Sequence, residues 1–146
     1  MNINLTASTT DAPAPPNHEN VPMANIDQIP PSACTNLIID NVLNKLTPQQ
    51  LELLTSKMRR GGTITIHSPD AMEMAKALYW ETINLEKFTA LTTSAVTQHS
   101  MIEIKTFFEQ RGYSIDIAHT DTTSLFFNIR AKRQRENPIN NKMRIA

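Results

Sequence analysis

Three side chains able to exchange protons follow two short apolar stretches of the chain. Asp40 ends "NLIID", and His67 and Asp70 flank the Ser68-Pro69 pair that follows "TITI". Open α/β sheets bind ligands at the carboxyl ends of their strands, and a histidine beside carboxylates can act as a general acid or base. If the protein is an enzyme, we expect Asp40, His67 and Asp70 to form its catalytic group. Two structural roles stay open: Asp70 in the first turn of a helix, and Asp40 with Asn41 at a strand end.

The other reactive residues show weaker patterns. Cys34 is the only cysteine, so the chain cannot form an internal disulfide, and we expect a small buried residue there rather than a nucleophile. The remaining histidines have no spacing typical of metal ligands; they are His18, His99 and His119. We therefore predict no metal site.

The charges are distributed unevenly along the chain. Residues 1–44 contain four acidic residues and no lysine or arginine, although the formal net charge of all 146 residues is zero. The acidic and basic parts could contact each other or face different partners. A basic end follows the last apolar run, and it could hold phosphate or an acidic surface, or only be solvated; it consists of Arg130, Lys132, Arg133 and Arg135. We do not expect nucleic acid as the partner.

Proline dominates the N-terminal stretch. Six of the nine prolines lie between Pro13 and Pro31, where they oppose both helix and central strand. We expect residues 1–33 to form an extended arm, residues 34–133 a domain, and residues 134–146 a polar tail. The chain shows no signal peptide and no apolar run long enough to span a membrane, so we expect an intracellular, cytoplasmic protein or a component of a viral particle.

The middle of the chain alternates between strand and helix signals. Residues 35–43 form an apolar run typical of a strand buried on both faces, and residues 63–68 alternate as a second strand. Thr47-Pro48-Gln49-Gln50 predicts a helix with Leu51, Leu54 and Met58 inward, ended by Gly61-Gly62. Ser68-Pro69-Asp70 predicts another helix that reaches Phe88, with these residues in its core stripe: Met72, Ala75, Leu78, Tyr79 and Trp80.

The last third predicts a helix and a hairpin. After a loop over residues 89–98, Ser100 to Glu103 form a capping box, and Gly112 ends the helix that it starts. Residues 113–120 and 124–133 form two strands, and their short connection makes them antiparallel. The predicted fold is α/β, half of a doubly wound sheet of about four strands that ends in an antiparallel hairpin.

Several segments resemble the C-terminal half of class I S-adenosylmethionine-dependent methyltransferases, which are Rossmann-like. "IPPSACTNLIIDNVLNKL" is similar to the loop and fourth strand of that family, and "LLTSKMRRGGTITI" to the helix, turn and fifth strand. "FFEQRGYSI" and "FFNIRAKR" resemble its last helix and last two strands. In that family the Gly-Gly pair before the fifth strand is a turn, and the cofactor is held by a separate Gly-x-Gly loop after the first strand.

The chain departs from the family at the cofactor site. Its three glycines are Gly61, Gly62 and Gly112, so none lies in the N-terminal part where the resemblance requires a Gly-x-Gly loop. Asn36, Asn44-Lys45 and Arg60 also stand where other residue types are usual. We therefore predict a truncated methyltransferase-like domain that lacks the cofactor-binding half and binds no cofactor.

The missing half would leave the strand at residues 35–41 without a partner on one side. An exposed apolar edge invites pairing with another chain, and here the edge consists of Leu37, Ile38 and Ile39. We predict that the arm, a second copy or a different protein covers it.

Three functions are consistent with these features of the sequence. The first is a non-catalytic structural or protein-binding subunit of a larger assembly, such as a viral particle. The second is a methyltransferase whose S-adenosylmethionine site is completed by another chain. The third is a binder of an acidic ligand or nucleic acid through the basic end.

Overall fold

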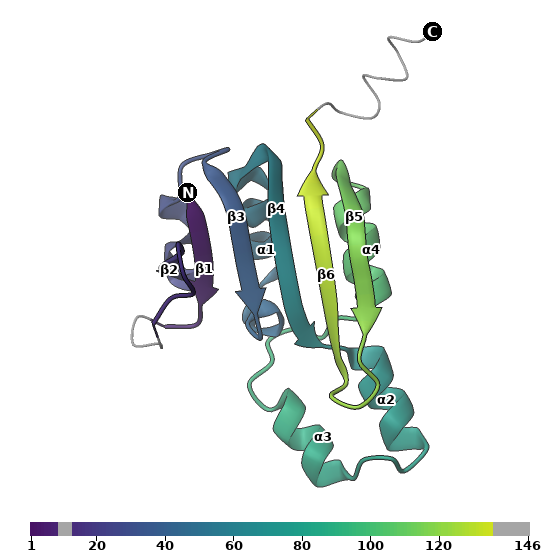
Figure 1. Cartoon of the computed structure of the whole chain (residues 1–146). Helices are drawn as coiled ribbons and strands as arrows, with labels where there is room; N and C mark the ends of the chain where they lie inside the picture. Colours follow the sequence, from purple (N-terminus) through teal and green to yellow (C-terminus); the bar gives the residue numbers. More distant parts are fainter. Residues whose placement is uncertain (9–12, 136–146) are drawn as a thin grey trace, which may run out of the picture.

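A computed structural model describes residues 1–8 and 13–135, and these form one six-stranded sheet in the order β2-β1-β3-β4-β6-β5 (Figure 1). β2, β1, β3 and β4 are mutually parallel, whereas β6 runs antiparallel to both of its neighbours. The strands are β1 Asn2–Thr6, β2 Glu19–Pro22, β3 Cys34–Asp40, β4 Met58–Pro69, β5 Tyr113–Thr120 and β6 Phe126–Arg133.

Helices cover one face of this sheet. Two of them, α1 (Pro48–Lys57) and α4 (Met101–Glu109), lie behind the strands in Figure 1. Leu54 of α1 and Phe108 of α4 are buried in the same core as every second residue of the central strands. The other helices are α2 Ala71–Tyr79, α3 Leu85–Thr92 and the short 3-10 helices η1 Met23–Gln28 and η2 Leu43–Lys45. None of the helices in the described part of the chain is long and apolar enough to cross a membrane.

The opposite face of the sheet is polar. The amide of Asn36 donates to the side chain of Asn2 over 3.1 Å, and that of Asn4 donates to Asn20 over 2.9 Å. In β3 only Cys34, Leu37 and Ile39 are buried, whereas Asn36 and Asp40 are exposed, so the prediction of a strand buried on both faces was wrong. In a doubly wound sheet, helices cover both faces. Here the second face carries amide and threonine side chains, which can face water without a covering layer of helices.

The stretch expected to be an extended arm contributes two strands. Ile3 and Leu5 of β1 are 0% and 2% exposed, and they lie opposite Leu37 and Ile39 of β3 in parallel register. The sheet therefore has six strands rather than about four. β1 pairs with the edge formed by Leu37, Ile38 and Ile39. Of the three candidates to cover this edge, namely the arm, a second copy or another protein, it is the arm that covers it in this chain.

The first helix begins as predicted and ends earlier. The Thr47 hydroxyl accepts from the backbone N–H of Gln50, and the Gln50 side chain accepts from that of Thr47, which completes a capping box. Helix α1 ends at Lys57, and Met58 already pairs with Cys34 as the first residue of β4. The prediction that Gly61-Gly62 ends this helix was wrong, because both glycines lie inside β4.

The second predicted helix is two helices. α2 ends at Tyr79, and Glu81 takes a left-handed conformation with φ of 59° before α3 begins. The buried residues of α2 are Met74 and Ala77, which form a second small core with Ile83 and Leu125. The predicted stripe was therefore wrong in part: Met72, Ala75, Tyr79 and Trp80 are exposed.

The third helix and the hairpin are confirmed. The Ser100 hydroxyl caps α4, and Gly112 after it has φ of 82°. β5 and β6 pair antiparallel from Tyr113↔Arg133 to Thr120↔Phe127. Between them, backbone N–H groups of Thr123 and Ser124 donate to the Asp121 carboxylate and lower its pKa.

Candidate functional site

The parallel strands bring the predicted catalytic residues to one edge of the sheet. Asp40 ends β3, and His67 lies opposite it near the end of β4. The same edge carries Thr6 at the end of β1 (Figure 1). Ligands of open α/β sheets bind at this carboxyl edge, so it is the first candidate site.

Asp40 and His67 form a solvent-accessible pair. His67 Nδ1 lies 3.0 Å from Asp40 Oδ1, and the imidazole stacks on the Phe126 ring with the centroids 4.7 Å apart. The side chains of His67 and Asp40 are 43% and 63% exposed. When the Nδ1 proton of neutral His67 points to Asp40, Nε2 is the basic nitrogen. This arrangement orients a base, and its exposure leaves it in contact with water.

Asp70 serves a structural role. It is 3% exposed, and its Oδ1 accepts from the backbone N–H groups of Met72 and Glu73 at the start of α2. Its Oδ2 accepts from the Thr120 hydroxyl over 3.0 Å and from the Met101 N–H over 3.4 Å. Both carboxylate oxygens of Asp70 therefore bond to neighbouring elements. Of the two roles that the sequence left open for Asp70, the structure shows the one at the start of a helix.

Asn41 ends β3. Its φ is 58°, and its backbone N–H donates to the carbonyl oxygen of His67 over 2.7 Å. Asparagine tolerates this left-handed conformation better than most residues. The bond ties the end of β3 to β4 and so supports the Asp40–His67 pairing.

The segment after β1 is compact. Thr6 is 6% exposed and its hydroxyl donates to the carbonyl oxygen of Ser8 over 2.9 Å. Ala7 packs against the main core. Each residue from Thr6 to Ser8 carries a Cβ, so no glycine lies in this described segment.

Cys34 lies at the start of β3, away from this edge. It is 1% exposed, and burial raises the pKa of its thiol. Its Sγ donates to the carbonyl oxygen of Asn36 over 3.2 Å. The prediction of a small buried residue is confirmed. Within the described residues, no group of histidine, cysteine and acidic side chains could hold a metal ion.

The four residues of the predicted basic end have separate environments. Arg130 forms an ion pair with Asp116, with Nη2 and Oδ2 2.9 Å apart. Arg133 donates to the carbonyl oxygen of Met58, whereas Lys132 is exposed. Arg135 lines a pocket at the opposite edge from Asp40 and His67. The four residues therefore do not form one continuous site.

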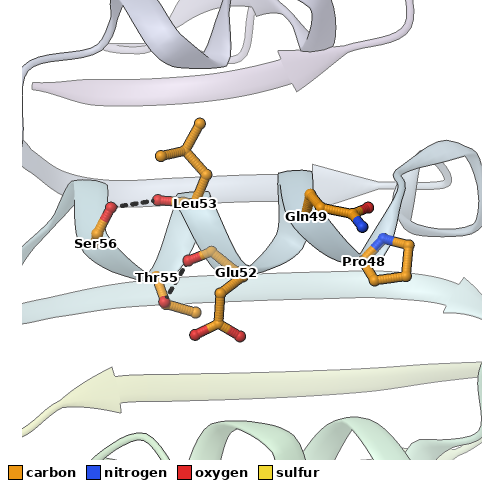
Figure 2. Close-up of a pocket in the computed structure, with 6 residues that line it drawn as sticks. All are labelled: Pro48, Gln49, Glu52, Leu53, Thr55 and Ser56. Atoms are coloured by element: carbon orange, nitrogen blue, oxygen red, sulfur yellow. Dashed lines mark hydrogen bonds between the residues drawn. The ribbon is translucent and has the colours of Figure 1, made fainter.

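A second hollow runs along the outer side of α1, and Figure 2 shows its six lining residues on that helix. The Thr55 and Ser56 hydroxyls bond to carbonyl oxygens of their own helix, those of Glu52 and Leu53. The Glu52 carboxylate lies 2.7 Å from Arg111 Nη2, and this contact lowers its pKa. Its polar groups are thus engaged within the protein, and the hollow offers little chemistry.

Sequence reasoning missed a basic pocket at the amino edge of the sheet. It is lined by Thr35, Arg59, Arg60, Gly61, Gly62 and Arg135. The signal was present in "RRGG", but that segment was interpreted as a helix end. Arg135 comes from a distant part of the chain, so its place in the pocket follows only from the pairing of β4 with β6.

The fold of the chain is similar to that of known methyltransferases. The structure is similar to an S-adenosylmethionine-dependent methyltransferase from Mesorhizobium loti, with a TM-score of 0.59 and 14% identity over 90% of this chain and 79% of that one. For an S-adenosylmethionine-dependent methyltransferase from Archaeoglobus fulgidus the TM-score is 0.56 and the sequence identity 15%, over 90% of this chain and 75% of that one. For magnesium protoporphyrin IX methyltransferase from Synechocystis the TM-score is 0.52 and the sequence identity 15%, over 80% of this chain and 52% of that one.

These comparisons define the fold. The chain has a Rossmann-like fold of the class I methyltransferase type, as predicted. It spans 52% of the length of the Synechocystis enzyme, and only 34% of the pyocyanin biosynthetic protein PhzM and 36% of an O-methyltransferase family protein from Burkholderia thailandensis, two further similar structures. No protein-family model matches the sequence, and no curated protein does.

The residues at the end of β1 do not fit S-adenosylmethionine in the way that the family resemblance implies. There the backbone approaches the cofactor through small residues, and glycine is used because it has no Cβ. In this chain Thr6 ends the strand and Ala7 and Ser8 follow it, and the Thr6 side chain is already buried and hydrogen-bonded. We derive no catalytic step through this cofactor.

Proposed function

We propose that this protein is a non-catalytic binding subunit with a methyltransferase-like fold and no S-adenosylmethionine site of its own. The observation that carries the proposal is the end of β1, where Thr6, Ala7 and Ser8 replace a glycine loop and Thr6 bonds back to Ser8. Folds are commonly reused for new functions, and function resides in sites rather than in the fold.

The exposed aromatic residues at the C-terminal end of α2 favour a protein partner. Tyr79 and Trp80 are 76% and 73% exposed and pack edge to face with centroids 5.1 Å apart. Leu85 at the start of α3 is 69% exposed. Tyrosine and tryptophan are enriched among residues that dominate protein–protein binding. Because β1 already lies along Leu37 to Ile39, we place the partner surface at Tyr79, Trp80 and Leu85 instead.

A calorimetric titration with S-adenosylhomocysteine tests the loss of the cofactor site. We expect no binding heat and no change in melting temperature. A ligand at 100 times its dissociation constant would add about 2.7 kcal/mol to stability, which is easily seen for a domain of this size. Such a shift in melting temperature would contradict the proposal. If the shift were lost in an Asp40→Asn variant but kept in an Arg130→Gln variant, the ligand would lie at the carboxyl edge.

Variants of the aromatic residues test the partner surface. We expect a protein captured from cell extract by the wild-type chain to be lost with Trp80→Ala and with Leu85→Ser. It should still bind Lys76→Ala, which changes an exposed residue of the same helix. Capture that is equal for all four proteins would contradict the assignment of this surface.

A second candidate is a methyltransferase whose donor site is supplied by another chain. The Asp40–His67 pair favours it, because an oriented histidine at a carboxyl edge can remove a proton from a methyl acceptor. This candidate predicts that S-adenosylhomocysteine binds only when the partner is present. It also predicts that His67→Gln abolishes transfer while leaving that binding intact.

A further inference from the structure

The Arg59–Gly62 segment is a bulge that opens a pocket at the amino edge of the sheet. Cys34 pairs with Met58, whereas Asn36 pairs with Thr63, so residues 59–62 loop out of the ladder opposite Thr35. The pocket lies between this bulge and Arg135. It is at the opposite end of β3 and β4 from Asp40 and His67.

Two glycines allow this shape. Gly61 has φ of 83°, which side chains other than glycine rarely adopt. A Cβ on Gly62 would lie 2.8 Å from the Arg59 carbonyl oxygen and 3.0 Å from those of Cys34 and Thr35. The backbone of β3 therefore passes directly against the bulge, and the bulge turns Arg59 and Arg60 to its outer side, where both are exposed.

The pocket has an excess of positive charge. Arg59, Arg60 and Arg135 line it, and none of its lining residues is acidic. Among the described residues, none of the three arginines forms an ion pair with a carboxylate, in contrast to Arg111 and Arg130, which pair with Glu52 and Asp116.

Part of the pocket is held in place by its own contacts. The Arg60 guanidinium donates to the Arg135 carbonyl oxygen over 3.2 Å, which links the bulge to the chain after β6. A guanidinium has five N–H donors, so Arg60 keeps others for a ligand. The planar donor fork of arginine matches the oxygens of phosphate.

From these contacts we propose that the bulge pocket is a binding site for phosphate groups, with Arg59, Arg60 and Arg135 as its donors. The phosphate can belong to a small oligophosphate or to a nucleic-acid backbone. The site is independent of the cofactor question, because it lies at the other edge of the sheet and uses none of the residues there.

Titrations with pyrophosphate and with a labelled single-stranded oligonucleotide test this site. We expect saturable binding that weakens about tenfold in Arg59→Gln and in Arg135→Gln, since each removes charge-assisted hydrogen bonds. Arg130→Gln is the matched control, because Arg130 is also exposed but paired with Asp116 outside the pocket. It should bind as the wild type does, and melting temperatures should show that all variants fold.

The two probes distinguish the sources of phosphate. Pyrophosphate binding at least as tight as that of the oligonucleotide supports a small ligand. Tighter oligonucleotide binding supports a nucleic-acid backbone. In that case the slope of the logarithm of the binding constant against the logarithm of the salt concentration should decrease in magnitude by about one for each arginine replaced. Failure of both probes to bind, or an equal loss in Arg130→Gln, would overturn the proposal.

Discussion

The two edges of the sheet differ in how their charged groups are satisfied. At the carboxyl edge, Asp70 uses both oxygens for internal hydrogen bonds and Asp40 is paired with His67. At the amino edge, Arg59, Arg60 and Arg135 surround a pocket without a carboxylate partner among the described residues. The edge where this fold usually binds ligands is the one whose groups are occupied by the protein itself.

This difference shows how a fold can keep its architecture while its chemistry changes. The Asp70 carboxylate at the carboxyl edge caps α2 and bonds to Thr120 and Met101, which serves folding. The bulge at the amino edge requires two glycines and presents two arginines to solvent, which contributes little to the core. Replacing Asp70 at the carboxyl edge should therefore affect stability, whereas replacing Arg59 or Arg135 at the amino edge should affect ligand binding.

Asp70→Ala should give the largest loss of stability, about 3 kcal/mol. It removes an N-cap worth about 1 kcal/mol and leaves the Thr120 hydroxyl and the Met101 N–H without their acceptor. Urea denaturation measures the effect, and Asp40→Ala, at an exposed site, should lose less than about 0.5 kcal/mol. Equal losses in the two variants would break the distinction between them.

Gly62→Ala should cost about 2 kcal/mol, because its Cβ would lie against three backbone carbonyl oxygens that cannot move separately. Gly61→Ala should cost about 1 kcal/mol, since the nearest atoms belong to the flexible Arg135 side chain and the strain is in φ alone. Thermal or urea unfolding compares the two. A neutral Gly62→Ala variant would show that the bulge is not packed against β3 in this way.

Tyr113→Phe should cost about 1 kcal/mol at neutral pH, because its hydroxyl donates to the Thr55 carbonyl oxygen over 2.9 Å in a buried position. Burial raises the pKa of Tyr113 to about 12, from an ordinary value near 10. The unfolded chain therefore ionises first, and stability present below pH 10 is lost as the pH rises from about 10 to 12.

Unfolding curves between pH 8 and 11.5 measure this dependence. In the Tyr113→Phe variant the alkaline loss of stability should be smaller than in the wild type. An identical alkaline limb in both proteins would assign the loss to other groups.

His67→Gln should have the smallest effect, within about 0.5 kcal/mol, because exposed ion pairs contribute little. Urea denaturation of the variant and the wild type would reveal any contribution of the Asp40 contact. A loss above 1 kcal/mol would show that the pair, like Asp70, belongs to the structural framework of the carboxyl edge.

Local signals predicted the parts of the fold that local interactions control. The capping box at Thr47, the Ser100 cap and the β5–β6 hairpin depend on residues close in sequence, and the structure contains all three. The burial of Cys34 was also predicted. The placement of Asp40 beside His67 followed from the general geometry of parallel strands.

Long-range pairing decided the rest. β1 is only five residues long, and it forms a strand because it pairs with the apolar edge of β3. The proline-rich sequence that follows β1 favoured the prediction of an extended arm instead of a strand in the sheet. The Arg59–Gly62 bulge likewise depends on where β3 passes, since Gly-Gly alone is equally typical of a helix end. The exposure of Tyr79 and Trp80 reflects a second core that uses Met74 and Ala77 instead.

The most direct test of the account is an amide NMR titration of one labelled sample, first with S-adenosylhomocysteine and then with pyrophosphate. We predict that the amides of Thr6, Ala7, Ser8 and Asn41 do not shift with the first ligand, and that those of Gly61 and Gly62 shift saturably with the second. Saturable shifts at Thr6 to Ser8 with S-adenosylhomocysteine, with no change at the glycines, would contradict the account.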